Sequence, residues 1–286
     1  MTVCAADDLQ AVFDSLKPGD TLELEPGIYR AKTMLQAPEV TLRGAGADKT
    51  ILLWDDYATK LDEQGREYNT FRTWTLAVCA DGVTMKDLAV VNQAGSPEKL
   101  GQEVALTVYA DRFTMERCRL SSTQDTLFLG PLPEDLIQRY DGFLPDILRR
   151  RISCRQRFRD CVIEGTVDFI FGCGEALFED CEIRSLADAR NIGYVAAPAH
   201  ALEQKTGFEF RRCRLTAQEG VAPGSIFLAR PWRDYGLCSF IDCQLGPHIH
   251  PDGFDKWNDT HRDRTARFFE TPPVPGRVSW CNRGEN

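Results

Sequence analysis

Long apolar runs are missing from this 286-residue sequence, and none approaches the roughly 18 residues that a membrane-spanning helix needs. The first eight residues, Met1-Thr-Val-Cys-Ala-Ala-Asp-Asp, also lack the basic and apolar segments of a secretory signal. We therefore expect a soluble protein without a membrane partner. Its expected location is the cytoplasm, or the outside of the cell if a native signal precedes this sequence.

Basic residues are in deficit, with 34 Lys and Arg against 43 Asp and Glu, which gives a net charge of −9. Such a balance disfavours partners with a polyanionic backbone, so we expect no nucleic acid partner. A neutral or sparsely charged substrate fits this charge better.

Patterns typical of metal and redox centres are missing as well. The four histidines are dispersed, and no pair among the eleven cysteines has the CxxC spacing, so we expect neither a metal nor a cofactor. An odd number of cysteines without a secretory signal argues against a disulfide framework. We interpret the cysteines as reduced thiols that act as small core residues. No G-x-S-x-G segment occurs, so a serine esterase is unsupported.

What the sequence does contain is a short phrase that recurs along the chain. Its five copies are Phe113-Thr-Met-Glu-Arg-Cys118-Arg-Leu120, Phe158-Arg-Asp-Cys161-Val-Ile163, Phe178-Glu-Asp-Cys181-Glu-Ile183, Phe210-Arg-Arg-Cys213-Arg-Leu215 and Phe240-Ile-Asp-Cys243-Gln-Leu245. Each copy alternates apolar and polar residues and is predicted to be a strand. An upstream copy has Leu88 in the cysteine position, and the anchors then follow at intervals of 30, 43, 20, 32 and 30 residues.

Repeats of this length without helical patterning between them indicate a solenoid, whose units bury their apolar edges only by stacking. We predict an all-β fold, a parallel β-helix with the cysteines stacked inside it, as one domain over residues 1–286. Residues Asp8 to Leu16 have helical spacing and predict a short N-terminal helical cap before a first strand at Thr21–Leu24. Residues 131 to about 153, with three prolines, predict an inserted loop.

Two aspartates occupy the same position of the repeated frame. Asp125 and Asp168 each follow a phrase cysteine by seven residues, so in a β-helix they would project from neighbouring coils roughly 5 Å apart. Two carboxyl groups that close cannot both ionise easily, which favours one acid and one nucleophile. The offset alone is weak evidence, because Asp188 has it too, after Cys181, and an aspartate here can also serve as an Asx turn.

Two further side chains suit a reaction centre. Arg230, in Ala229-Arg230-Pro231-Trp232, is the best candidate to keep one aspartate anionic, although this segment can also be a packing corner. Gln124 can donate a hydrogen bond to a developing oxyanion.

With these segments together, the sequence resembles the pectin methylesterases, the pectinesterase family of right-handed parallel β-helix carbohydrate esterases. The matching stretches are Gly101-Gln-Glu-Val-Ala-Leu106, Gln124-Asp-Thr-Leu-Phe128, Gly165-Thr-Val-Asp-Phe-Ile-Phe-Gly172 and Arg230-Pro-Trp232. Weaker similarity covers nearly the whole chain. The inserted loop resembles that of bacterial members.

The resemblance implies a mechanism for hydrolysing methyl esters of galacturonate in pectin or its oligosaccharides. Asp168 would attack the ester carbonyl, and Gln124 with help from Gln102 would hold the oxyanion. Asp125 would protonate departing methanol and then activate water, while Arg230 would orient Asp168 and keep it charged.

The resemblance also implies substrate contacts for Trp232 and Phe171, on sugar faces, and for Thr70, which matches an upstream Thr-Phe pair of the family. Phe128, in a matching stretch, is assigned to substrate binding with them. The partner is thus a methyl-esterified oligogalacturonide, and we expect a monomer. The basic run Arg149 to Arg151 can either meet galacturonate carboxylates or form a solvated loop face.

Two other functions stay open at this point. A β-helix glycoside hydrolase acting on polygalacturonate would also need two carboxylates at about this distance. A non-catalytic pectin-binding β-helix is the other alternative, although every expected site position holds a chemically competent residue. Relatives with altered ester substrates are also conceivable on one fold.

Overall fold

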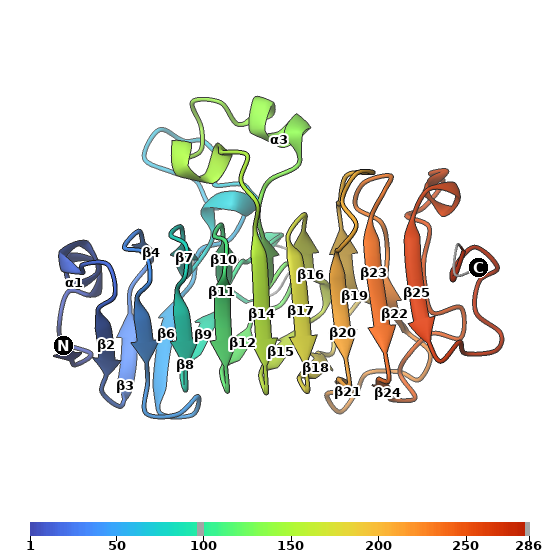
Figure 1. Ribbon diagram of the computed structural model, residues 1–286, viewed down its shortest axis with the longest axis horizontal. Helices are drawn as coiled ribbons and strands as arrows, with labels where there is room; N and C mark the ends of the chain where they lie inside the picture. The colour runs from blue at the N-terminus through green and yellow to red at the C-terminus, as the bar shows by residue number, and fades with distance from the viewer. Residues whose placement is uncertain (96–99, 284–286) are drawn as a thin grey trace.

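The computed structural model describes residues 1–95 and 100–283, and these residues form a parallel β-helix with three sheets running along it (Figure 1). The ten-stranded sheet consists of β1 (Thr2–Val3), β2 (Thr21–Leu24), β5 (Thr41–Arg43), β8 (Thr84–Lys86), β11 (Phe113–Glu116), β14 (Arg155–Arg159), β17 (Glu175–Glu179), β20 (Phe208–Arg211), β23 (Leu237–Ile241) and β25 (Arg267–Thr271). The eight-stranded sheet consists of β3 (Gly27–Arg30), β6 (Thr50–Trp54), β9 (Ala89–Asn92), β12 (Arg119–Ser121), β15 (Val162–Gly165), β18 (Glu182–Ser185), β21 (Arg214–Ala217) and β24 (Gln244–Leu245). The seven-stranded sheet consists of β4 (Thr33–Leu35), β7 (Leu76–Val78), β10 (Leu106–Val108), β13 (Leu127–Leu129), β16 (Val167–Gly172), β19 (Gly193–Pro198) and β22 (Ile226–Ala229).

Each recurring phrase, predicted as one strand, is in fact two strands that meet at a corner. The first copy ends β11 at Glu116, turns at Arg117 with φ of 51°, and enters β12 at Arg119. The equivalent residues Asp160, Asp180, Arg212 and Asp242 have φ between 51° and 55°. One left-handed residue redirects the chain into the next sheet, and the alternation of side chains continues on both sides of it, so the pattern could not reveal the corner.

Identical side chains stack from coil to coil inside the β-helix. Phe158, Phe178, Phe210 and Phe240 lie opposite one another in register, with ring centroids 4.8, 4.6 and 4.6 Å apart. The phrase cysteines form a second ladder, and the thiol of Cys213, for example, donates to the carbonyl of Phe178 at 3.4 Å. All eleven cysteines are free, and eight of them are buried, which agrees with the interpretation of these as core thiols; Cys4, Cys243 and Cys281 are half-buried.

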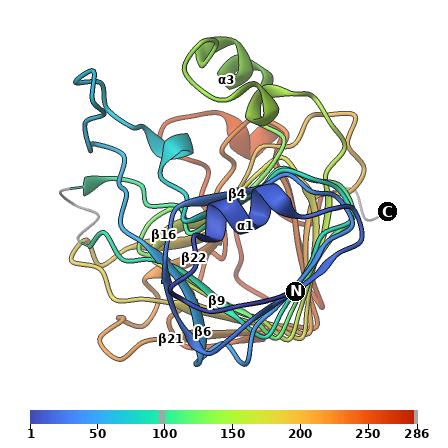
Figure 2. The same ribbon diagram turned by 90° about the vertical axis from the view of Figure 1, so that its left-hand side faces the viewer.

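The N-terminal end of the β-helix is closed by the helix α1 (Leu9–Ser15), which lies across the open coil (Figure 2). The carboxylate of Asp8 accepts the backbone N–H groups of Gln10 and Ala11, so it caps the helix. Leu9 and Phe13 are buried against the first coil. The predicted cap is therefore confirmed, but Thr21–Leu24 is not the first strand, because β1 pairs alongside it at the edge.

The chain leaves the coil between β13 and β14, and this insertion contains α3 (Glu134–Arg139) and the 3₁₀ helix η2 (Asp146–Arg149). It stands above the coil beside the 3₁₀ helix η1 (Thr70–Arg72), as Figure 1 shows. Its buried side chains Leu136 and Tyr140 join Phe71, Phe128 and Phe171 in a second apolar cluster on the outside of the seven-stranded sheet. A further 3₁₀ helix, η3, spans Arg262–Arg264. None of the helices described is long and apolar enough to cross a membrane.

Candidate active site

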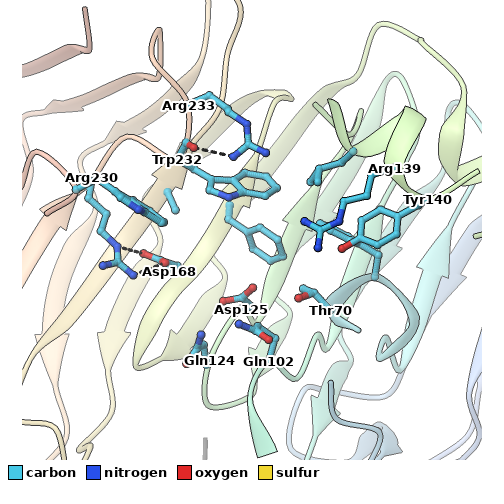
Figure 3. A pocket seen from close by; sticks show the side chains of 15 residues that line it. Thr70, Gln102, Gln124, Asp125, Arg139, Tyr140, Asp168, Arg230, Trp232 and Arg233 are labelled. Atoms are coloured by element: carbon cyan, nitrogen blue, oxygen red, sulfur yellow. Dashed lines mark hydrogen bonds and ion pairs between the residues drawn. The ribbon is translucent and has the colours of Figure 1, made fainter. Parts of the chain in front are cut away.

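A cavity of about 400 Å³ opens on the outer face of the seven-stranded sheet, under the insertion (Figure 3). It is lined by Thr70, Phe71, Gln102, Gln124, Asp125, Leu136, Arg139, Tyr140, Asp168, Phe171, Ala197, Arg230, Trp232, Arg233 and Trp257. All the residues predicted to form the site are in this set except Phe128. The fold therefore gathers segments that lie up to 187 residues apart in the chain, from Thr70 to Trp257.

The two aspartates come from neighbouring coils, as the repeated frame predicts. Strand β13 pairs with β16 with Leu127 opposite Ile170, and the same offset sets Asp125 opposite Asp168. The backbone N–H of Asp125 donates to the carbonyl of Val167 at 3.1 Å, which fixes the two turns against each other. Both residues are mostly buried, with exposed fractions of 8% for Asp125 and 7% for Asp168.

Both aspartates have left-handed backbones, with φ of 65° at Asp125 and 49° at Asp168. The register between β16 and β19 shifts between Val167 and Ile170, so Asp168 lies in a β-bulge. A bulge re-aims one side chain relative to an otherwise regular strand, and strained backbones of this kind are common at functional sites. At the end of the same strand only glycine fits, because a Cβ on Gly172 would lie 2.0 Å from the carbonyl oxygen of Leu129.

The two carboxyl groups differ in their charged neighbours. The guanidinium of Arg230 donates to both oxygens of Asp168, from Nε at 2.8 Å and Nη2 at 2.6 Å. Burial, and then the nearby Asp168, raises the pKa of Asp125 well above its usual range. Burial also raises the pKa of Asp168, but Arg230 opposes that rise. The pKa of Asp125 is thus raised further than that of Asp168, and the pairing with Arg230 favours the charged form of Asp168.

Arg230 is itself held between two aromatic rings. Its guanidinium carbon lies 3.8 Å from the ring centre of Tyr194 and 4.0 Å from that of Trp257. Cation–π contacts with a partly buried guanidinium are stabilising and restrict its rotation. These two rings could not be predicted from the sequence, since they belong to segments far from Arg230 that carry no recognisable motif.

Two amide side chains border the aspartates. Gln102 precedes β10, and Gln124 precedes β13 in the next coil. The segments are tied together by the backbone N–H of Glu103, which donates to the carbonyl of Gln124 at 3.0 Å. In Figure 3 both amides lie beside Asp125 at the floor of the cavity. Amide N–H groups at this place can stabilise negative charge on a reacting oxygen.

An aromatic wall stands beside the aspartates. Trp232 lies edge-to-face with Phe171 at 5.7 Å between ring centroids, and both line the cavity. Phe128 does not line it, contrary to the prediction, because it packs beneath the wall at 5.1 Å from both Phe71 and Phe171 and is 2% exposed. Its side chain belongs to the apolar cluster under the insertion and supports the wall.

The insertion supplies the opposite side of the cavity. Arg139 and Tyr140 line it, and the Tyr140 hydroxyl donates to Asn69 at 2.8 Å. Among the described residues Arg139 has no carboxylate partner and contacts only the ring of Tyr140, with 5.7 Å to its centre. Arg233 also lines the cavity and pairs with Asp135 at 2.7 Å.

The basic run of the insertion does not reach the cavity. Arg149 pairs with Asp141 at 2.8 Å and with Asp146 at 2.5 Å. Arg151 is exposed and pairs with Glu134. Of the two interpretations of this run, the structure supports the solvated loop face for Arg150 and Arg151, which are exposed, whereas Arg149 is largely buried beside its two carboxylate partners. The basic residues of the cavity wall, Arg139 and Arg233, were missed because nothing in their local sequence separates them from ordinary surface arginines.

The described residues include no group of three or more His, Cys, Asp or Glu side chains placed to hold a metal ion. The arrangement offers a carboxylate paired with an arginine, a carboxyl group with a strongly raised pKa, and amide donors within one partly enclosed cavity. Chemically, such a set can carry out nucleophilic attack on a carbonyl group followed by proton transfer to the leaving group.

Comparisons with known proteins agree with carbonyl chemistry at this site. The family model described as pectinesterase matches residues 5–131 and 146–277. Pectinesterase QRT1 from Arabidopsis thaliana is 31% identical and aligns with 98% of this chain and 69% of its own length. A pectin methylesterase structure from Yersinia enterocolitica is 25% identical with a TM-score of 0.78, over 95% of this chain and 93% of that chain. A pectin methylesterase in complex with a hexasaccharide is also 25% identical, with a TM-score of 0.76, over 91% and 82%. These likenesses confirm the right-handed parallel β-helix.

Proposed function

This chain belongs to the pectinesterase family and is a carboxylic ester hydrolase that removes methyl esters from pectin, and we propose that Asp168 and Asp125 divide the chemistry between them. The observation that carries this proposal is the asymmetry of the pair. Arg230 donates two hydrogen bonds to Asp168, whereas burial and the neighbouring charge keep a proton on Asp125.

In the first half of the proposed reaction, a carboxylate oxygen of Asp168 forms a bond to the ester carbonyl carbon of a galacturonate unit. The carbonyl oxygen becomes an oxyanion, and the amides of Gln124 and Gln102 donate hydrogen bonds to it. When the intermediate collapses, the bond to the methoxy group breaks. Asp125 gives its proton to that oxygen, methanol leaves, and an acid anhydride joins the substrate to Asp168.

In the second half, Asp125 is an anion and takes a proton from a water molecule. The water oxygen attacks the acyl carbon, and collapse of this second intermediate releases the free galacturonate carboxyl group and restores the carboxylate of Asp168. Because the first step needs the protonated form of Asp125, we expect the rate to fall as pH rises through its pKa. Arg230 does not change protonation state and keeps Asp168 oriented throughout.

Substrate binding is proposed to use both walls of the cavity. Trp232 and Phe171 offer apolar faces to sugar rings, and Thr70 offers a hydroxyl group on the opposite side. A related pectin methylesterase has been solved with a hexasaccharide bound, which supports an oligosaccharide as the ligand of this cavity. Phe128 packs against Phe171 beneath the aromatic wall and supports it there.

The proposal is tested by measuring methanol release from methyl-esterified oligogalacturonides. Asp168→Asn keeps the shape of the side chain and removes the nucleophile, so we expect a loss of about 1,000-fold or more. Asp125→Asn removes the acid and base, and a loss of about 100- to 10,000-fold is expected. Asp146→Asn is the matched control, because Asp146 is exposed on the insertion outside the cavity.

New reducing ends are assayed in the same samples. Their appearance without methanol would favour a glycoside hydrolase over an esterase. Undiminished methanol release by Asp168→Asn would remove Asp168 from the centre of the mechanism.

A further inference from the structure

We propose that Arg190, held by Asp188, is a positioning residue that fixes which way the side-chain amide of Gln124 faces in the cavity. This inference rests on the proposed function only in giving Gln124 a role as an oxyanion donor. Arg190 lies in the connection between β18 and β19, one coil beyond Asp168, and it does not line the cavity itself.

The direct evidence is the hydrogen bond from Arg190 Nη1 to Oε1 of Gln124, at 3.0 Å. A guanidinium group can only donate, and an amide has its acceptor on one side and its donors on the other. Gln124 must therefore present its oxygen to Arg190, which directs its NH₂ group the opposite way. That group is the one that is needed beside a reacting carbonyl oxygen.

Asp188 in turn fixes the guanidinium. Arg190 Nε lies 2.8 Å from one carboxylate oxygen of Asp188 and 3.0 Å from the other, and Nη2 completes the pairing. The backbone N–H of Arg190 donates to the same carboxylate at 2.7 Å. The Asp188 side chain is only 4% exposed, so this pair is shielded from water on the aspartate side. A bidentate Arg–carboxylate pair fixes the orientation of the guanidinium as well as placing its charge.

Asp188 occupies the same position of the sequence repeat as the two aspartates of the cavity. It follows Cys181 by seven residues, as Asp125 follows Cys118 and Asp168 follows Cys161. Three successive coils thus carry an aspartate at one frame position. The first two enter the cavity, while the third holds the arginine that orients an amide of the first coil.

Arg190 has a second effect, through its charge. It lowers the pKa of both Asp125 and Asp168, against the rise that burial causes. Removing the charge while leaving the fold intact should therefore shift the titration of the aspartate pair to higher pH. A residue with a purely structural role would leave that titration in place.

The test is a double-mutant cycle on methanol release. Arg190→Met is expected to lower kcat by about tenfold or more with KM within about twofold, since loss of a whole oxyanion donor costs roughly 100- to 1,000-fold. In a Gln124→Ala background the same substitution should change kcat by less than about twofold when each variant is assayed at its own optimal pH, because the orienting target is gone and only the charge effect on the aspartates remains. Arg190→Lys keeps the charge and should preserve the pH profile with intermediate kcat.

Arg212→Met is the matched control, because Arg212 forms the same bidentate pair with Asp180 at the corner between β20 and β21, and it does not line the cavity. It should leave kcat unchanged. Equal losses from Arg190→Met in both backgrounds, or no loss in either, would overturn the inference.

A measurement without substrate separates this inference from the proposed function. Carboxyl-carbon NMR of the Asp125 and Asp168 pair should show a higher titration range in Arg190→Met than in the parent protein and in Arg190→Lys. If the parent releases no methanol, the proposed function fails, but the titration still tests the role of Arg190. If the pH range over which the aspartates titrate is the same in Arg190→Met as in the parent, Arg190 does not act on this site.

Discussion

Glu103 shows at the residue scale how the fold holds an ionisable group that the proposed reaction does not use. Its side chain is fully buried behind the amide residues and accepts a hydrogen bond from the hydroxyl of Thr123 at 2.8 Å. The hydroxyl of Ser122 donates to its backbone carbonyl, and its own N–H donates to Gln124. Burial raises the pKa of Glu103 to about 7. This carboxyl group therefore links the segments that carry the two amides.

This shift predicts a pH-dependent change of stability in Glu103→Gln. Between about pH 4.5 and about pH 7 the folded state keeps the proton and the unfolded state loses it, so the free energy of unfolding of the parent falls as pH rises and then levels off. The variant lacks this penalty. Its advantage should grow across the window to on the order of 3 kcal/mol at pH 8.

Urea unfolding followed by tryptophan fluorescence at pH 5 and pH 8 measures the difference. Glu219→Gln, at an exposed position, is the control and should behave like the parent. An equal advantage of Glu103→Gln at both pH values would contradict the buried, protonated carboxyl.

At the scale of elements, the insertion of residues 131–153 is the part of the chain that gives the cavity its second wall. Leu136 and Tyr140 anchor it in the apolar cluster over the seven-stranded sheet. The helix α3 ends at Arg139, whose guanidinium lines the cavity without a carboxylate partner among the described residues. In a protein of net charge −9, such a cation suits an anionic group on the ligand. Free carboxylates of unesterified galacturonate units are such groups.

We therefore predict that Arg139→Gln lowers kcat/KM for partly esterified oligogalacturonides by about five- to tenfold, because a partly desolvated charge pair contributes about 1 kcal/mol or more. Fully esterified oligomers, which offer no carboxylate beside the reacting unit, should lose less than about twofold. Arg149 on the same insertion pairs, among the described residues, with Asp141 and Asp146, so Arg149→Gln should affect neither substrate. Equal losses on both substrates would instead indicate a structural effect of Arg139.

At the scale of the whole molecule, stability comes from ladders that run along the β-helix. Phe210 is stacked between Phe178 and Phe240, with centroids 4.6 Å away on both sides and planes within 8° of parallel. It is fully buried in the main core cluster. Each coil depends on its neighbours to bury such a face, so a defect in one coil weakens the stack on both sides.

Phe210→Ala is expected to lower the free energy of unfolding by about 3–5 kcal/mol, because it opens a cavity between two coils that cannot close up independently. Phe210→Leu should cost clearly less. Both values are measured by urea unfolding, with methanol release per folded molecule expected to stay unchanged, since Phe210 lies inside the coil and not at the cavity. A cost below about 1 kcal/mol for the alanine variant would show that the ladder contributes little.

Much of the architecture follows from the sequence by itself. The spacing of the phrase cysteines determines how the coils stack, and the shared offset of Asp125 and Asp168 puts them on neighbouring coils, because parallel strands in register carry equal offsets to equal places. Asp8 predicts the start of the cap by the chemistry of its side chain. These features depend on periodicity or helix capping, and both are visible in stretches of sequence no longer than one or two coils.

Only the tertiary structure decided the rest. The corner inside each phrase depends on a single left-handed residue that alternation does not reveal. Phe128 lies under the wall instead of in the cavity, since the insertion folds over that part of the sheet. The rings of Tyr194 and Trp257 around Arg230, Arg139 at the cavity and Arg190 on Gln124 arise from contacts between distant segments. No local pattern encodes such contacts, because they form only when separate coils and loops pack together.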